Sequence, residues 1–180
     1  MKVSCFGASA LTEPAYASMV SVGQLLARRG VEVLTGAFGG AMEAPAKGAS
    51  MEGGMSTGYT LAGMPGNPYL SQLLDCQIVY GAGLPKEIQF GTRLGHLLLA
   101  DAFIFAAEGG IGTIVEFAAI CNFNGRGWKP QKRVAILDPK GSWKAALDSF
   151  VVLGFLTSPA KDCIKLFATA EEAVEWICEG

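Results

Sequence analysis

The sequence predicts one α/β domain, residues 1–180, built on a doubly wound, mostly parallel sheet with helices on both faces. Short apolar runs alternate with longer segments whose apolar residues recur at helical spacing, which is typical of βα units around a parallel sheet. Hydrophobic residues make up 51% of the chain and charged residues only 17%, so a sizeable core is expected. The length of 180 residues suits one domain rather than two.

Strands and helices alternate along the first half of the chain. Gly30 is predicted to end the first helix, because glycine easily adopts the left-handed conformation found there. Pro45 falls in the first turn of the second helix, where its missing N–H costs little. Residues 65–68 (PGNP) are predicted to form a loop. Strands are predicted at residues 2–6, 31–35, 55–62 and 77–80, and helices at about 16–27 and 41–50.

The second half continues this pattern. The strand predicted over residues 101–107 shows no polar alternation, so it should be buried on both faces. A glycine turn at 109–112 leads into a helix that reaches about residue 123, and residues 124–127 (NGRG) are predicted to be a surface loop. The remaining helices are predicted at residues 86–99, 143–153 and 171–178, and the remaining strands at 134–137 and 164–167.

Charge and cysteine usage disfavour several functional classes. The net charge is −2 with no basic block, whereas a nucleic-acid surface needs clustered Lys and Arg. The five cysteines form no C-x-x-C pair and their number is odd, so we expect buried thiols in a reducing cytoplasm rather than disulfides or a metal site. The longest apolar stretch, 97–107, contains Asp101 and is too short to span a bilayer. The N-terminal apolar run is too short for a signal peptide. We therefore expect a cytoplasmic protein with no membrane or nucleic-acid partner.

The strongest functional signal is the segment EGGIGTIVE at residues 108–116. Its glycines let the backbone approach a ligand, and the positive end of the following helix points at the same spot. Thr113 and Glu116 lie three residues apart on one helix face, so a bound phosphate would have a hydroxyl and a carboxylate beside it. The alternative is a capping box, in which Glu116 only returns to a backbone N–H. The glycines of this turn are Gly109, Gly110 and Gly112.

Two further strand-to-helix turns are candidate nucleotide-binding turns. The turn after the second strand contains Gly36, Gly39 and Gly40, which could instead serve tight strand–helix packing. The turn after the first strand contains Gly7 and Ser9, which could instead form an ordinary βα loop. In open α/β sheets, ligands bind beyond the carboxyl ends of the strands, where such turns meet helix N-termini.

The composition of these turns narrows the ligand class. The chain has no G-x-x-x-x-G-K-[ST] segment, so a P-loop is excluded. The first turn is not G-x-G-x-x-G, and the second strand lacks the acidic residue that would hold an NAD ribose. An AMP-like mononucleotide is therefore favoured, with no cofactor and no metal. Taken alone, Arg93 is typical of a surface cation, and His96, the single histidine, of a packing residue.

The three turns, in their order and spacing, resemble the Lonely Guy (LOG) family, long mislabelled as lysine decarboxylases. FGAS at residues 6–9 is similar to the family's C-G-[SA]-S-like segment, and residues 35–43 are similar to its G-G-G-x-x-G-L-M-G turn. The family motif P-G-G-x-G-T-x-x-E resembles residues 108–116, which follow ADAFI at 100–104. The match extends from the first strand to about Asp138.

The resemblance implies a Rossmann-like protein that hydrolyses the N-glycosidic bond of a nucleoside 5′-monophosphate, releasing the base and ribose 5-phosphate. The family's catalytic arginine and glutamate correspond to Arg93 and Glu116. A carboxylate beside the ribose would stabilise an oxocarbenium-like transition state, and Arg93 could hold the phosphate or orient Glu116. Glu108 replaces the family's proline and is expected to place a second carboxylate near the phosphate.

The resemblance also implies a homodimer and leaves two other functions open. A binding or carrier protein of the same fold, similar to the molybdenum-cofactor carriers, would hold a nucleotide or cofactor without turnover. A structural α/β domain would have capped helices and empty turns. The homodimer is further suggested by an apolar helix with more hydrophobic surface than one sheet face needs, carrying Phe117, Ile120, Cys121 and Phe123.

Overall fold

The computed structural model describes residues 1–63, 69, 77–79, 83–126 and 131–179. The loop predicted at residues 65–68 lies outside this range, as do Cys76, Tyr80 and Gly127. In the described part of the chain, no helix combines the length and the apolar character needed to cross a membrane.

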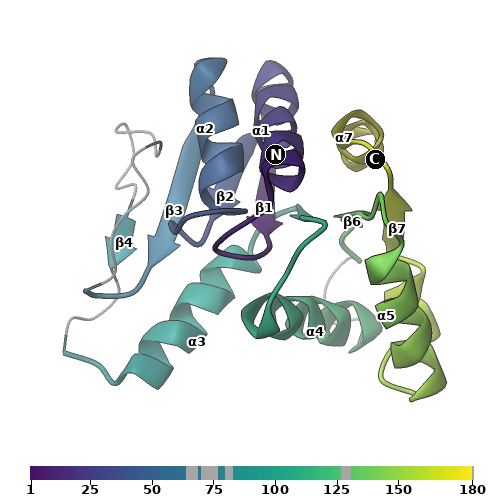
Figure 1. Cartoon of the computed structure of the whole chain (residues 1–180). Coiled ribbons are helices and arrows are strands. Elements are labelled where there is room, and N and C mark those ends of the chain that lie inside the picture. Colours follow the sequence, from purple (N-terminus) through teal and green to yellow (C-terminus); the bar gives the residue numbers. More distant parts are fainter. Residues whose placement is uncertain (64–68, 70–76, 80–82, 127–130, 180) are drawn as a thin grey trace.

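Seven parallel strands form one sheet in the order β4-β3-β2-β1-β5-β6-β7, which confirms the doubly wound α/β fold (Figure 1). The chain builds outward from β1 to β4 and then returns to the other side of β1 with β5. Adjacent strands β1 and β5 therefore send their chains to opposite sides, and the gap between their carboxyl ends is where ligands bind in such sheets. The strands are β1 (Lys2–Phe6), β2 (Glu32–Thr35), β3 (Ser56–Thr60), β4 (Gln77–Val79), β5 (Ala102–Phe105), β6 (Val134–Leu137) and β7 (Ile164–Phe167).

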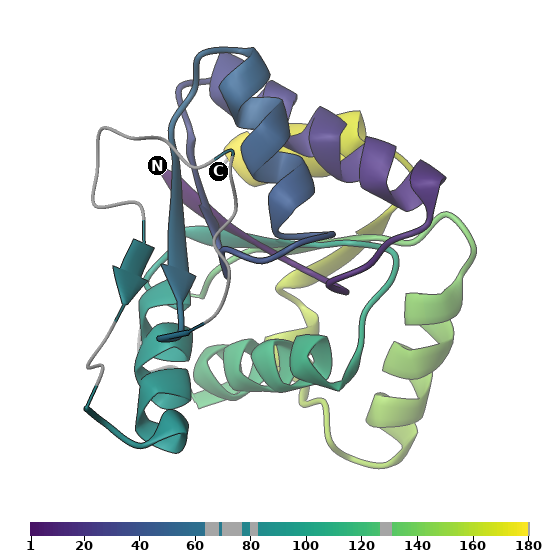
Figure 2. The same cartoon turned by 60° about the vertical axis from the view of Figure 1, so that its left-hand side comes forward.

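Helices cover both faces of the sheet, as Figure 2 shows, with α1, α2 and α7 on one face and α3, α4 and α5 on the other. Alternate residues of β1 point into the two layers: Val3 and Cys5 pack under α1 and α7, whereas Phe6 packs with the aromatic layer under α4 and α5. The helices are α1 (Glu13–Arg28), α2 (Glu43–Met51), α3 (Lys86–Leu97), α4 (Ile111–Arg126), α5 (Ser142–Val152), α6 (Ser158–Lys161) and α7 (Ala170–Cys178).

The aromatic layer fixes α4 and α5 on the sheet. The ring of Phe105 meets Phe117 edge-on at 5.7 Å and Trp143 at 5.8 Å. The indole N–H of Trp143 donates to the carbonyl of Ala106 at 3.0 Å, so the buried ring satisfies its polar group while it anchors the start of α5. Phe117 and Ile120 are only 3% and 1% exposed, so they belong to this core and not to the dimer surface predicted for them.

The predicted surface loop at 124–127 is wrong for its described residues, because α4 continues to Arg126. Asn124 is buried, its amide donates to the carbonyl of Lys132 at 2.9 Å, and its side-chain oxygen accepts the N–H of Lys132 at 3.1 Å. These two bonds satisfy a polar side chain that read as a turn former, and they hold the helix end to the chain that enters β6. The short helix α6 has no counterpart in the sequence prediction.

Candidate functional site

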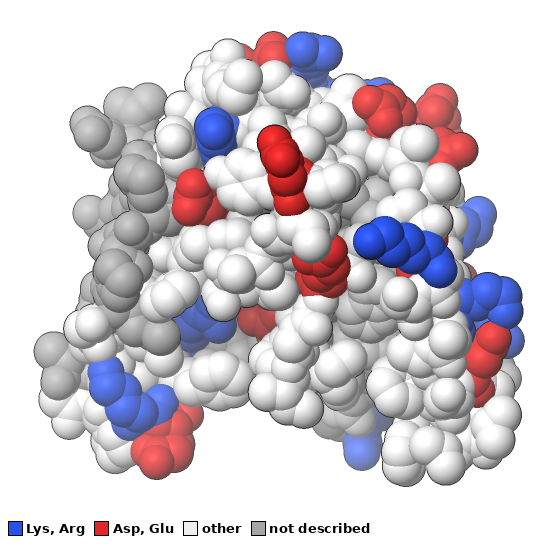
Figure 3. All heavy atoms as spheres, in the orientation of Figure 1, with Lys and Arg blue, Asp and Glu red and all other residues white. Residues whose placement is uncertain are grey.

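A cleft of about 490 Å³ opens at the carboxyl edge of the sheet, between the turns that follow β1 and β5. Seven of the predicted site residues line this cleft, and they come from the first and third turns, from α3 and from α4. Charges of both signs are interspersed over the described part of the face in Figure 3. Attraction of an anion must therefore come from groups inside the cleft rather than from a basic surface. The seven residues are Gly7, Ser9, Arg93, Gly110, Gly112, Thr113 and Glu116.

The α4 turn presents backbone N–H groups to the cleft. The first bond within the helix joins the N–H of Ile114 to the carbonyl of Gly110 at 3.2 Å. The preceding N–H groups, at residues 111–113, thus have no acceptor within the helix. A Cβ built at Gly110 or Gly112 would meet no atom within 4 Å, so both glycines leave the turn open to a ligand. This geometry is that of an anion-binding helix N-terminus.

The other glycines bring the three turns together. Gly40 has a left-handed φ of 59°, and a Cβ there would lie 2.4 Å from the carbonyl oxygen of Ala8. The N–H of Ala41 donates to that same oxygen at 2.9 Å, and the N–H of Ala8 donates to the carbonyl of Glu108 at 2.9 Å. The first turn is therefore bonded to both of its neighbours. Gly39 packs against the Ser9 carbonyl in the same junction, and Gly109 packs against Thr113.

Arg93 and Glu116 meet inside the cleft. Nη1 of Arg93 lies 3.6 Å from Oε1 of Glu116, and both side chains are 11% exposed. At this distance the contact is an ion pair rather than a hydrogen bond. Arg93 is thus a buried partner of Glu116, not the surface cation that α3 alone suggests.

Burial shifts the ionisation of both partners. Removal from water raises the pKa of Glu116 from 4.5 to about 7, against the opposing effect of the Arg93 charge. Burial likewise lowers the pKa of Arg93, and Glu116 opposes that change. A carboxyl group with a pKa near 7 inside a cleft is a typical acid–base or electrostatic site.

The capping-box alternative does not fit this geometry. Thr113 lies inside α4, which begins at Ile111, so it is not the N-cap residue of the helix. Its hydroxyl instead accepts the N–H of Gly110 at 3.3 Å. The carboxylate of Glu116 pairs with Arg93. Thr113 therefore supports the turn, while Glu116 faces the cleft.

The carboxylate of Glu108 lies away from the cleft, which corrects the expectation of a second negative charge beside the phosphate site. Its oxygens accept the N–H of Thr12 at 2.9 Å and the hydroxyl of Thr12 at 2.5 Å. These bonds hold the pKa of Glu108 below its usual value. Glu108 thus occupies the N-terminus of α1. Asp138 does the same for α5, where it accepts N–H groups of Trp143 and Lys144.

One wall of the cleft is apolar, and sequence reasoning did not single it out. It carries Phe90 from α3, which lies three residues before Arg93 and so shares its helix face. Phe38, inside the second glycine turn, is the other aromatic ring. His96, predicted to pack, stacks on the ring of Tyr59 at 5.2 Å. Within the described ranges, no three His, Cys, Asp or Glu residues gather as metal ligands. The apolar wall consists of Phe38, Met42, Leu61 and Phe90.

Comparison with known proteins gives a family and several relatives. The model of the SLOG cluster4 family matches residues 1–145. An uncharacterized protein of Archaeoglobus fulgidus is 28% identical over 98% of this chain and 93% of its own length. The solved structure of TM1055, a Northeast Structural Genomics Consortium target, is 28% identical with a TM-score of 0.72, over 98% of this chain and 97% of that one. The molybdenum cofactor binding protein of the phototrophic bacterium Rippkaea orientalis is 25% identical with a TM-score of 0.66, over 98% and 93%.

Proposed function

We propose that this chain, which belongs to the SLOG cluster4 family, hydrolyses the N-glycosidic bond of a nucleoside 5′-monophosphate and releases the free base and ribose 5-phosphate. This is the LOG-type reaction that the three glycine-rich turns imply. One observation carries the proposal: a buried carboxylate, Glu116, stands beside an open helix N-terminus in a cleft of suitable size. A site that bound only an anion would gain nothing from a carboxylate there.

The phosphate of the substrate would bind at the start of α4. The N–H groups of residues 111–113 point into the cleft, and the helix dipole adds a partial positive charge. Ser9 lines the cleft from the first turn and can offer its hydroxyl. With the phosphate at this turn, the ribose would lie near Glu116, one helical turn farther along α4.

Glu116 would act in its ionised form. Cleavage of a glycosidic bond passes through a transition state with positive charge on the ribose ring, which a nearby carboxylate stabilises. Water then completes the reaction at the anomeric carbon. The apolar wall, with Phe38 and Phe90, would contact the flat base, because aromatic rings stack well on one another.

A panel of nucleoside monophosphates, analysed by chromatography for free base and ribose 5-phosphate, tests this proposal. Glu116→Gln keeps the size of the side chain but removes its charge. We expect hydrolysis to fall by ~10² or more, which corresponds to roughly 2.7 kcal/mol of barrier, with little change in nucleotide affinity. A Glu116→Gln protein with wild-type turnover would refute the mechanism.

A carrier function is the second candidate, favoured by the similarity to the Rippkaea orientalis protein, whose name describes molybdenum cofactor binding. A carrier would use the same open turn for a phosphorylated ligand. The buried carboxylate argues against it as the main role, because Glu116 would repel such a ligand whenever it is ionised. Tight binding of a nucleotide or of molybdenum cofactor, with no hydrolysis of any monophosphate, would establish the carrier.

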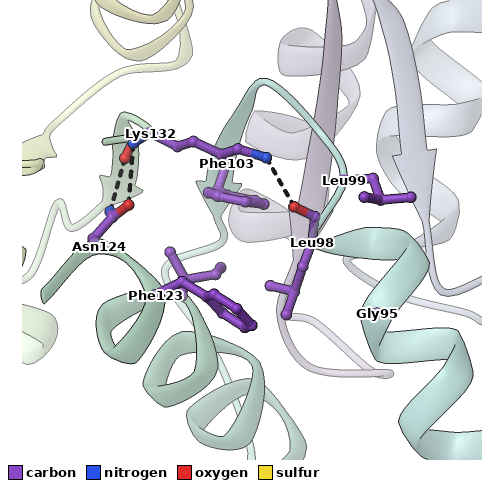
Figure 4. A pocket seen from close by; sticks show the side chains of 8 residues that line it. Gly95, Leu98, Leu99, Phe103, Phe123, Asn124 and Lys132 are labelled. Atoms are coloured by element: carbon purple, nitrogen blue, oxygen red, sulfur yellow. Dashed lines mark hydrogen bonds between the residues drawn. The ribbon is translucent and has the colours of Figure 1, made fainter. Parts of the chain in front are cut away.

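We also propose that the protein is a homodimer that pairs through the face formed by α3 and α4. Exposed apolar side chains are concentrated there, and a pocket of about 190 Å³ opens between the two helices (Figure 4). Figure 4 shows Leu99 and Phe123 at this pocket, which a second copy could cover. Light scattering that gives a monomer at micromolar concentration would refute the dimer. The exposed residues are Ile88, Phe90, Leu99, Ile111, Val115 and Phe123.

A further inference from the structure

The guanidinium of Arg93 lies directly against Gly36, the last residue before the second glycine turn. A Cβ built at Gly36 would stand 1.7 Å from Nη2 and 2.9 Å from Cζ of Arg93. No side chain fits between the two residues while Arg93 keeps its place. The absence of a side chain at position 36 is therefore a condition for the observed position of the guanidinium.

Every nitrogen of this guanidinium has a protein partner. Nε donates to the carbonyl of Tyr59 at 2.8 Å, and Nη2 donates to the carbonyl of Gly36 at 3.3 Å and contacts the sulfur of Met42 at 3.7 Å. Nη1 faces Glu116. The carbonyls at the ends of β2 and β3 thus hold the plane of the guanidinium, and its remaining nitrogen is directed at one carboxylate.

On the proposed function, we infer that Gly36 is a positioning residue, which acts through Arg93 to hold Glu116 as the reactive carboxylate. Arg93 serves Glu116 and not the phosphate. The sequence left both roles of Arg93 open and gave Gly36 only to the nucleotide. In the structure, the guanidinium is occupied on three sides by the chain itself, and Arg93 is the charged group that affects Glu116.

Gly36→Ala separates this role from a general packing role. The φ of Gly36 lies outside the left-handed region, so alanine is compatible with the backbone there. The atoms that the new methyl group would meet belong to the ends of two flexible side chains, Arg93 and Met42. We expect the chain to fold with the guanidinium displaced. Glu116, still buried, would then lose the cation that opposes its protonation.

The test is a titration of the Glu116 carboxyl carbon by NMR in the wild-type protein and in Gly36→Ala. We expect the midpoint to rise by about one pH unit or more, since an opposite charge at such range moves a carboxyl pKa by about 1–3 units. In the hydrolysis assay, kcat at pH 7 should fall more than KM changes, and part of the loss should return at higher pH. Gly54→Ala is the control, because its Cβ would meet Ala27 Cβ at 2.4 Å, between α2 and β3. It should lower stability without moving the titration.

Arg93→Ala supplies the second arm. If Gly36 acts through Arg93, adding Gly36→Ala to Arg93→Ala should change the Glu116 midpoint no further. Should Gly36→Ala alone fail to fold, the double variant has room for the methyl group and should fold as Arg93→Ala does. An unchanged midpoint in Gly36→Ala, an additive shift in the double variant, or a double variant that also fails to fold would each overturn the inference. The titration needs no turnover, so an inactive wild-type protein would refute the proposed hydrolysis while the midpoint still decides the role of Gly36.

Discussion

Burial of Glu116 is predicted to make the stability of the protein depend on pH in a defined direction. The folded state holds the carboxyl proton up to about pH 7, whereas the unfolded chain releases it near 4.5. The stabilisation is therefore complete below pH 4.5 and is lost as the pH rises through about 7. At about 1.4 kcal/mol for each pKa unit, the total change is about 3 kcal/mol.

Urea unfolding of the wild-type protein and of Glu116→Gln measures this effect. Glutamine cannot titrate, and the other ionisable groups are common to both proteins. The difference in unfolding free energy between them should therefore isolate Glu116. We expect the wild-type protein to lose about 3 kcal/mol relative to Glu116→Gln between about pH 4 and about pH 9. A difference that stays constant over this range would show that Glu116 is not a buried group with a raised pKa.

The same ionisation predicts the opposite trend for activity. The carboxylate is the form that stabilises a positive ribose ring, so hydrolysis should increase as the pH rises through about 7. Stability would fall over the pH range in which activity rises. A rate that declines over this range would mean that Glu116 acts as a proton donor instead.

Three further predictions concern the neighbours of Glu116. Arg93→Ala should raise the pKa of Glu116 above about 7 and reduce turnover at pH 7 several-fold, with partial recovery at pH 9; a flat pH–rate comparison would contradict the ion pair. A crystal soaked with AMP or phosphate should show the anion within hydrogen-bond reach of the N–H groups of Gly112 and Thr113, and an anion bound elsewhere with this turn empty would refute the site. Glu108→Ala should lower the unfolding free energy by about 1 kcal/mol, because α1 loses the carboxylate at its N-terminus. Calorimetry should find phosphate affinity unchanged in that variant, whereas tighter binding would mean that the Glu108 carboxylate opposes the anion.

Local patterns were enough to predict most of the fold. The strands β5 and β6 are unbroken apolar runs buried on both faces, and such runs leave little choice of structure. The end of α4 could not be predicted in this way. Asn124 and Gly125 are turn formers by composition, and the hydrogen bonds of Asn124 to Lys132 that favour helix come from beyond the local window.

The site could be predicted only as far as strand order reaches. Turns that follow neighbouring parallel strands must meet at one edge, so Gly7, Ser9 and the α4 turn were correctly predicted to lie together. The pairing of Arg93 with Glu116 had no local signal and was predicted only through the resemblance. Arg93 lies in a segment of α3 whose other residues are mostly partly exposed, and its burial arises from contacts with the carbonyls of Gly36 and Tyr59.

The distribution of carboxylates among helix N-termini identifies where an anion is attracted. The helices α1, α4 and α5 all begin at the carboxyl edge of the sheet, and each offers the same backbone dipole. Glu108 occupies the start of α1 and Asp138 the start of α5, so a negative ligand meets a negative charge at both. At α4 the side chain at the turn is the neutral hydroxyl of Thr113. The sequence places Glu108 next to this turn, yet its bonds to Thr12 remove its charge from the cleft and leave the α4 terminus to the ligand.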